Sequence, residues 1–473
     1  MNSWLQIQEN ILERDLIAEI KLSNITPIRI GGYNAKPFSH ALNLMEIPRV
    51  QSMKGLWRWW ARAILAGAIL HNKGSLPKGI SNIDKMVSKL LGSTKESSKL
   101  FIQLTIEPNK ISYISSSELK NIPRVKLVTM GLSDWEKRII EQYYKTLSLK
   151  VTIGTRKNIE ENSNDAVMFA LSSLIISIIF SGIGSITTRG FGKLKINNVE
   201  SKNPKLSTEI INLDKLLKEL YQKDDEYDIT KKLKDLILVS LEYASSYMSL
   251  ERRVSDIKIS EIPLYPTLLL NCDPEIFRLE TICISKRNSQ QILECLGRSV
   301  LKTEWKRKKY MPIKSSGKYL HTWVLGLPRY QELTYEEDGK RKKQLTGYII
   351  DNEKEKRRQS PIGFTILECS NGLALVMYGF LTSEFSKKLK GYNTSILKHI
   401  GVNITNSNIK EVVRKIKSIE ETNVYDDLLA QGVSFPRKSQ LVDPILSTDD
   451  LYKLCFDAAW DFVRQIIKDG CCR

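Results

Sequence analysis

The first half of the chain alternates between strand-like and helix-like hydrophobic patterns. Apolar and polar residues alternate from Leu16 to Ile30, which predicts a strand that ends at Gly31 and Gly32. We expect helices at 54–71 and 166–180, and further strands at 100–106, 125–130, 147–153 and 193–196. The order strand, helix, strands, helix, strand predicts a ferredoxin-like (RRM-like) βαββαβ domain with insertions.

The second half repeats part of this order. Residues 208–253 have the pattern of two charged amphipathic helices. After them we expect a strand at 276–284, a helix at 289–305, a long basic loop, strands at 361–369 and 373–380, and helices from Glu384 to a C-terminal helix at 449–467. We therefore predict an α+β chain of two ferredoxin-like βαββαβ domains with helical insertions, at 1–254 and 255–473.

The net charge indicates a polyanionic partner. The chain has 72 Lys and Arg against 53 Asp and Glu, a formal charge of +19, and its pI is about 9.4. Cations placed at phosphates release condensed counterions, so an excess of this size favours nucleic acid. The alternative is a solvated basic surface without a partner.

Seven cysteines are present, none in a C-x-x-C pair and none before Cys272. This pattern predicts free thiols in a reducing cytoplasm, with neither a disulfide framework nor a metal site. The first residues lack the basic and apolar regions of a secretion signal.

A stretch of 21 residues without a charge, 166–186, is long enough to cross a bilayer. Serines interrupt it, Gly182 and Gly184 break its end, and no second such stretch follows. We therefore predict a buried helix and no membrane contact, and keep a membrane-anchored basic protein as an alternative.

The segment 53–63, MKGLWRWWARA, is the most informative part of the predicted helix. Lys54, Arg58 and Arg62 recur at i, i+4 and i+8 with no carboxylate between them, so a bound anion would relieve their repulsion. Trp59 flanks this row and could stack on a base. The alternative is a solvated face with Trp59 half-buried. The expected core stripe is Leu56, Trp57, Trp60, Ile64 and Ala68.

A glycine-rich segment, 182–193, follows the apolar helix and reads GIGSITTRGFGK. Glycines let backbone N–H groups approach a phosphate, and Arg189 and Lys193 add positive charge. The segment lacks the G-K-[ST] of a nucleotide-binding P-loop, so we expect no cofactor. A purely structural glycine turn is the alternative.

Together these segments resemble a known family. The T-R-G-F-G of 188–192, after an apolar helix and before a strand, resembles the signature loop of the RAMP superfamily of CRISPR proteins. The segment 26–32 (T-P-I-R-I-G-G), followed by 54–63, resembles the first RAMP subunits of type III-B Cmr effector complexes. The resemblance covers roughly residues 14–200, and the second half matches more weakly through 357–362.

The resemblance implies two RRM-like domains in a non-catalytic, RNA-binding subunit near the 3′ end of the guide RNA, which contributes to target RNA capture in antiviral defence. It implies guide RNA, target RNA and other Cmr RAMP subunits as partners. The RNA-binding residues that it implies are Arg29, Gly31, Gly32, Lys54, Arg58, Trp59, Arg62, Arg189, Gly190, Phe191, Gly192, Lys193, Arg357 and Arg358.

The sequence itself also favours a protein without catalysis. None of the four histidines lies in a metal-binding motif, and no run of aspartates could hold Mg²⁺. A metal-independent endoribonuclease that processes guide RNA is the enzymatic alternative, with His40 or a tyrosine as its base. A basic stretch at 298–329, with interleaved aromatic residues, either contacts RNA or forms a mobile surface.

Overall fold

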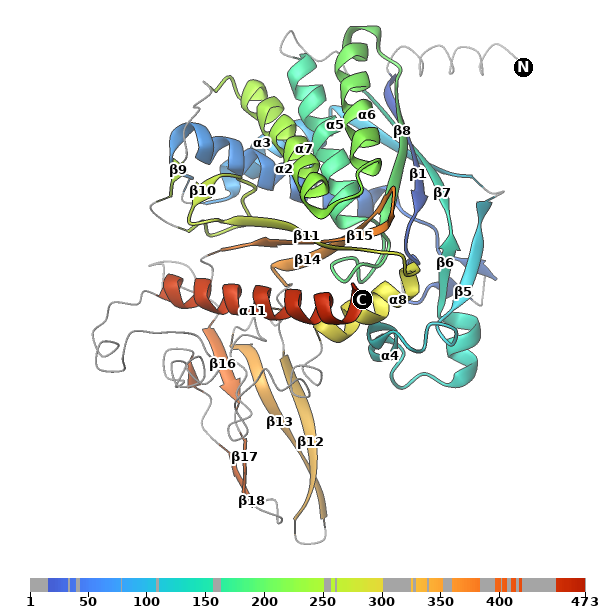
Figure 1. Cartoon of the computed structure of the whole chain (residues 1–473), viewed down its shortest axis with the longest axis vertical. Coiled ribbons are helices and arrows are strands. Elements are labelled where there is room, and N and C mark those ends of the chain that lie inside the picture. The colour runs from blue at the N-terminus through green and yellow to red at the C-terminus, as the bar shows by residue number, and fades with distance from the viewer. Residues whose placement is uncertain are drawn as a thin grey trace.

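Two antiparallel sheets and the helices between them make up most of the described chain (Figure 1). The computed structural model describes residues 16–32, 35–39, 43–77, 79–107, 110–155, 163–250, 257–259, 262–300, 325, 329–337, 340–351, 360–382, 396–400, 402–405, 410–413, 417–418 and 448–472.

The first sheet has the strand order β4-β7-β1-β8, and each neighbouring pair is antiparallel. Its strands are β1 (Leu16–Asn24), β4 (Leu100–Ile106), β7 (Ser148–Thr155) and β8 (Leu194–Ser201). Taken along the chain, this order is second, third, first, fourth, with a helix crossing after the first strand and after the third. The first half therefore has the predicted βαββαβ connection.

Two long helices cover one face of this sheet, α2 (Val50–Lys73) and α5 (Ser163–Ser181). Trp57 Nε1 donates to the Ala170 carbonyl and to Ser173 Oγ, both at 2.9 Å. Trp60 Nε1 donates to Ser181 Oγ at 2.7 Å. The serines that interrupt the apolar helix thus accept hydrogen bonds from buried indoles, which removes the cost of burying both groups.

The helix α5 is long and apolar enough to span a membrane, but 89% of its 18-residue apolar stretch is buried inside the protein. Its burial against α2, α7 and β8 explains the missing charges. Of the predicted stripe on α2, the four residues after Leu56 are fully buried, and Leu56 is half-buried.

Further helices and an insertion complete the first half. Helices α3 (Ser81–Leu91), α6 (Ser207–Tyr221) and α7 (Glu226–Tyr247) pack beside α2 and α5. The insertion between β4 and β7 contains β5 (Ser112–Ser115), α4 (Pro123–Val128), the π-helical turn η2 (Glu136–Ile140) and β6 (Gln142–Thr146). The predicted strand at 125–130 is wrong: Pro123 begins a helix there, because proline suits a first helical turn.

The second sheet has three described strands in the order β11-β15-β14, namely β11 (Phe277–Ser285), β14 (Ile362–Cys369) and β15 (Gly372–Phe380). Helices α8 (Ser289–Ser299) and α11 (Thr448–Cys471) lie on one side of it (Figure 1). This is a βαββα order, and no fourth strand joins the sheet among the described residues. A complete second ferredoxin-like domain therefore stays a prediction.

Two parts of the second half differ from expectation. Within the predicted basic loop, β12 (Arg329–Glu337) and β13 (Lys340–Asp351) pair as a hairpin. Where helices were predicted after Glu384, the described residues form strands instead. These are β16 (Ile396–Ile400), β17 (Val402–Thr405), β18 (Lys410–Val413) and β19 (Lys417–Ser418). The short elements elsewhere are β2 (Phe38–Ser39), β3 (Leu44–Met45), β9 (Ile257–Lys258), β10 (Cys272–Asp273) and the 3₁₀ turn η3 (Pro204–Leu206).

The second sheet is buried on both faces, so the two halves share their cores. Phe380 and Val376 belong to one large cluster with the helices of the first half. Phe364 and Met377 belong to a second cluster with α8 and α11. The layers are thus sheet, helices, sheet, helices, and the halves pack against each other through an apolar interface.

The predicted free thiols are partly wrong. Cys283 is bonded to Cys472, and Cys295 to Cys471, whereas Cys272 and Cys369 are free. The partners are 189 and 176 residues apart, so sequence spacing gave no sign of the pairing.

Candidate nucleic-acid interface

A pocket of about 440 Å³ brings together three of the segments singled out in the sequence. Residues 29–32 form one wall, the first turns of α2 form a second, and the start of the glycine-rich segment, 183–185, forms a third. Its remaining lining residues are Ala35, Pro48, Arg49 and Leu104. Segments that are more than 150 residues apart in sequence therefore meet at one site.

Arg29 shapes this pocket from within the protein. Its guanidinium forms two parallel hydrogen bonds with the Glu141 carboxylate, at 2.9 and 2.8 Å, and donates to the Ala35 carbonyl at 3.0 Å. The residue is 8% exposed. A buried, bidentate ion pair of this kind fixes the turn that contains Gly31 and Gly32. The positive charge of Arg29 is neutralised by Glu141, so it positions the pocket wall and offers no exposed cation.

The glycine-rich segment approaches Arg29 through its backbone. Ser185 N donates to the Arg29 carbonyl at 2.8 Å, and Ser185 Oγ donates to the same oxygen at 3.2 Å. Gly184 has a φ of +91°, and a Cβ at this position would lie 2.6 Å from that carbonyl. Only glycine fits both the conformation and the space. The two motifs of the resemblance are thus joined directly.

The N-terminus of α2 opens at the same pocket. Arg49 is the N-cap in an extended conformation, its side chain makes no capping bond, and no acidic residue lies in the first turn. The positive end of the helix dipole is therefore not neutralised by its own first turn. Arg49 is paired with Glu46 at 2.9 Å, and its side chain remains 46% exposed. A helix terminus with an adjacent arginine is a suitable surface for phosphate.

Gly55 lies in the second turn of this helix, where glycine is unfavourable. It is exposed, and a Cβ built on it would meet nothing within 4 Å. Glycine in a helix costs about 0.5–1 kcal/mol relative to alanine, and nothing within the described chain requires it here. The helix α2, whose Met53 and Leu56 line the pocket, therefore carries no side chain at this exposed position.

The predicted row of cations on α2 is in part tied to α3. Arg62 pairs with Asp84 at 3.0 Å, so the premise that the row has no acidic neighbour is wrong. Arg58 donates to the Leu91 carbonyl at 3.1 Å, and Lys54 also has partners within the protein. The acid comes from a separate helix, which helical spacing within 54–62 could not reveal.

Trp59 packs inside the protein. Its ring lies 5.0 Å from that of Trp60 and 5.3 Å from that of Phe380, with edge-to-face geometry in both pairs. The residue is half-buried and joins α2 to β15. The expected base-stacking surface is therefore largely covered by aromatic neighbours.

The rear of the glycine-rich segment, 189–192, lies between the two halves of the chain. Arg189 is 4% exposed and donates to the carbonyls of Leu325 at 2.7 Å and Ile362 at 3.4 Å. Phe191 is fully buried in the cluster of the second sheet, α8 and α11. A Cβ at Gly190 would lie 2.8 Å from Leu296 of α8. Gly192 N donates to the Pro27 carbonyl at 3.0 Å.

These contacts correct the prediction for 189–192. The four residues were expected to border an RNA surface, but their side chains and backbone join the first sheet to the second. The Phe364 amide also donates to the Thr188 carbonyl at 3.3 Å. This contact adds a parallel β-bridge between Arg189 and Phe364 beside the second sheet. The loop is an internal connector because its charge and its aromatic ring find partners in the other half.

Lys193 is fully buried, which also differs from the expected phosphate contact. Its Nζ donates to the carbonyls of Phe180 at 2.5 Å and Ser181 at 3.3 Å, at the C-terminal end of α5. These carbonyls carry the negative end of the helix dipole and lack partners within the helix. Burial lowers the pKa of Lys193 to about 7. Its role is to cap α5.

Some sequence-based candidates lie outside the described residues. These are Arg357, Arg358, His40 and all but a few residues of the basic stretch 298–329. Conversely, Arg49, Ser52 and Ser185 line the pocket although the sequence analysis assigned them no role. The sequence gave little indication of Arg49 and Ser52, because the predicted helix begins at 54 whereas α2 begins at Val50.

The family comparison agrees with the topology of the first half. Residues 21–195 match the family model of the RAMP superfamily. This range begins within β1 and ends within β8, so it covers the βαββαβ unit and every wall of the pocket. The family match and the βαββαβ topology therefore fall on the same part of the chain.

Two individual relatives match parts of the chain. The chain is similar to the CRISPR system CMR subunit Cmr1 of Saccharolobus solfataricus, 23% identical over 39% of this chain and 55% of that protein. It is also similar to Cmr1-2 of Pyrococcus furiosus, 27% identical over 37% of this chain and 92% of that protein. The chain spans about half the length of the Saccharolobus relative. The resemblance stated from the sequence is confirmed.

A solved structure shares the overall fold. A chain of the type III-B Cmr-beta complex bound to cognate target RNA and AMPPnP matches with a TM-score of 0.52 and 16% identity. The match covers 77% of this chain and 94% of that one. At this identity the likeness concerns the fold, and it extends beyond residues 21–195 into the second half.

Proposed function

We propose that this chain is a non-catalytic, RNA-binding RAMP subunit of a type III-B Cmr ribonucleoprotein. It lies near the 3′ end of the guide RNA and contributes to target RNA capture in antiviral defence. The observation that carries the proposal is the pocket at the start of α2, where both motifs of the resemblance meet. The names of the relatives and the charge of +19 support it.

The pocket offers the groups that single-stranded RNA needs. The start of α2 and Arg49 present positive potential to a phosphate. Met53, Leu56 and Ile183 give the wall an apolar part that can contact a sugar or the face of a base. Arg49 is assigned to a phosphate, and the apolar side chains make no hydrogen bond to a base edge, so we expect binding that depends little on sequence.

The proposed membership of a Cmr ribonucleoprotein implies the partners and the location of the chain. Guide RNA, target RNA and other Cmr RAMP subunits are the proposed partners, in the cytoplasm and without a membrane. Among the described residues, no group of three His, Cys, Asp or Glu side chains could hold a metal ion.

An RNA-binding measurement tests the pocket. We expect Arg49→Ala to weaken binding of single-stranded RNA several-fold, measured by fluorescence anisotropy at a series of salt concentrations. The slope of log affinity against log salt should fall by about 0.7 for one lost phosphate contact. Equal binding by wild type and variant would show that the pocket is not part of the RNA-binding surface.

Lys218 on α6 supplies the matched control. Its side chain is 56% exposed and pairs with Asp214, so it resembles Arg49 in exposure and in having one acidic partner. We expect Lys218→Ala to leave both affinity and salt slope unchanged. A loss equal to that of Arg49→Ala would mean that RNA responds to total charge and not to the pocket.

The absence of catalysis is tested separately with guide repeat RNA and with target RNA paired to a guide, in the presence of a chelator. We expect wild type and His40→Ala to bind these RNAs without cutting them. Specific cleavage by wild type that is lost in His40→Ala would establish the endoribonuclease instead.

A further inference from the structure

Two disulfides tie the last turn of α11 to the second sheet and to α8. Cys472 bonds to Cys283 on β11, and its neighbour Cys471 bonds to Cys295 on α8. The Cα–Cα distances, 5.7 and 5.8 Å, are those of ordinary disulfides. The same helix also packs its Phe456 and Trp460 against Arg278 of β11, with the guanidinium over both rings.

The two bonds are redundant as tethers. Each alone closes a loop of more than 170 residues, which strongly restricts the unfolded chain. Their ends are close in sequence, since Cys283 and Cys295 are 12 positions apart (295 − 283) and Cys471 and Cys472 are adjacent. Once one bond has formed, the second closes only a short ring and adds a smaller restriction. Either bond therefore keeps α11 in place.

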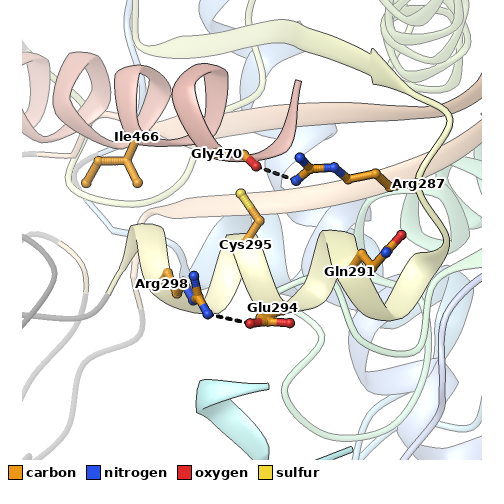
Figure 2. Close-up of a pocket in the computed structure, with 7 residues that line it drawn as sticks. All are labelled: Arg287, Gln291, Glu294, Cys295, Arg298, Ile466 and Gly470. Atoms are coloured by element: carbon orange, nitrogen blue, oxygen red, sulfur yellow. Dashed lines mark hydrogen bonds and ion pairs between the residues drawn. The ribbon is translucent and has the colours of Figure 1, made fainter. Parts of the chain in front are cut away.

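A pocket of about 310 Å³ leads to one of these bonds. It lies between α8 and the end of α11, and Cys295 is among its lining residues (Figure 2). Arg287 donates to the Gly470 carbonyl at one side, and Arg298 pairs with Glu294 at 2.5 Å on the other. Neither Cys283 nor Cys472 lines it; Cys283 is 2% exposed and Cys472 is half-buried, so it is the pocket, and not overall exposure, that distinguishes Cys295.

The charges around this sulfur favour an anionic visitor. Among the lining residues, two arginines face one carboxylate, that of Glu294. Nearby cations also stabilise a thiolate in place of a thiol, so Cys295 is a better leaving group when a second thiol attacks its mixed disulfide. The lining residues thus combine a disulfide sulfur, space for a small molecule and one more cation than anion.

We propose that this pocket is a thiol–disulfide exchange site for a small anionic thiol. The thiolate attacks Cys295 Sγ, a new S–S bond forms between them, and Cys471 leaves as a thiolate that takes up a proton. A second thiol then attacks the mixed disulfide, which releases the oxidised small-molecule disulfide and the Cys295 thiol. Two thiols are oxidised and one protein disulfide is reduced, while Cys283–Cys472 still holds α11.

Three ethyl thiols that differ in charge test the proposal on the native, full-length chain. These are 2-mercaptoethanesulfonate, 2-mercaptoethanol and cysteamine, with rates normalised to those on a small model disulfide. Samples are alkylated at intervals and mapped by mass spectrometry. We expect Cys295 and Cys471 to be labelled first, with the sulfonate at least about fivefold faster than cysteamine, the effect of one charge pair in water at close range.

Several outcomes would overturn it. They are earlier opening of Cys283–Cys472, the same normalised rate for all three thiols, or four unbonded cysteines before any thiol is added. Cys272 and Cys369, which are free, report alkylation without exchange and serve as an internal control.

Variants separate charge from access and from folding. We expect Arg287→Gln with Arg298→Gln to remove the preference for the sulfonate, whereas Lys218→Gln, far away on α6, keeps it. Cys283→Ser and Cys295→Ser should each leave α11 protected in hydrogen exchange, and only the double variant should expose it. Exposure of α11 in either single variant would overturn the redundancy of the two tethers.

Discussion

The two ends of the glycine-rich segment 182–193 have similar sequences but different surroundings. Its front, Gly184 and Ser185, lines an open pocket beside the N-terminus of α2. Its rear, Arg189 to Lys193, is buried between the halves of the chain. Both ends contain glycine at positive φ, and only the rear contains cations. A cation in a glycine loop is therefore no proof of a ligand, because here protein carbonyls accept its hydrogen bonds.

This contrast predicts opposite consequences of substitution. Changes at the rear should lower stability, and RNA binding should fall only as far as the fold is lost. Changes at the pocket mouth should lower RNA binding and leave stability almost unchanged, within about 0.5 kcal/mol for an exposed residue such as Arg49.

Phe191→Ala should give the largest loss of stability. The ring is fully buried in the cluster of the second sheet, so its removal leaves a cavity between the halves. We expect a loss of about 3–5 kcal/mol in the free energy of unfolding, measured by urea denaturation. Phe191→Leu, which keeps most of the volume, should lose much less. A loss below about 1 kcal/mol for Phe191→Ala would mean that the loop is not anchored as described.

Arg189→Ala should rank second. It leaves the Leu325 carbonyl without its charged donor, which costs about 1–3 kcal/mol for a buried group left unsatisfied, whereas the Ile362 carbonyl still accepts a hydrogen bond from Ser360 Oγ. Arg189→Lys keeps a cation that can reach one carbonyl and should recover part of the loss. Urea denaturation checks both variants. Equal stability of wild type and Arg189→Ala would show that the connector contributes nothing.

Lys193 should make stability depend on pH. Its pKa is about 7 in the folded protein and near 10.5 when exposed, so between these values the unfolded chain binds more protons at this site. Stability should therefore rise with pH through this window, by up to about 1.4 kcal/mol per unit, and level off below pH 7. Lys193→Met removes this titration, so the difference between the two proteins isolates it. A difference that is flat from pH 7 to 9.5 would contradict the burial of the amine.

Gly55→Ala should give the smallest change in stability. It tests the pocket, whereas the preceding variants test the rear of the glycine-rich segment. Alanine should stabilise α2 by about 0.5–1 kcal/mol, because it reduces the entropy of the unfolded chain and meets nothing in the folded one. We expect RNA binding to weaken, because the added methyl group lies at an exposed position of α2 between Met53 and Leu56, which line the pocket. Tighter binding together with higher stability would show that RNA does not approach this turn.

Much of the fold of the first half could be predicted from the sequence. Periodicity placed β1, α2, β4, β7, α5 and β8 close to their true positions, and most of the α2 core stripe is buried as expected. Long amphipathic or wholly apolar segments carry a strong local signal. Arg29, Gly31 and Gly32, which the resemblance implied as RNA-binding residues, line the pocket, and their contact with RNA stays a prediction.

The partners of polar and sulfur groups were decided only by the tertiary structure. Asp84 for Arg62, Glu141 for Arg29, the carbonyls around Arg189 and Lys193, and both disulfides all join residues brought together by folding. Hydrophobic periodicity indicates which face of a helix or strand is buried, because the apolar residues recur at regular spacing within that element. A single charge or thiol has no such repeat, so its sequence shows what it can bind, and only the fold determines which partner lies within reach.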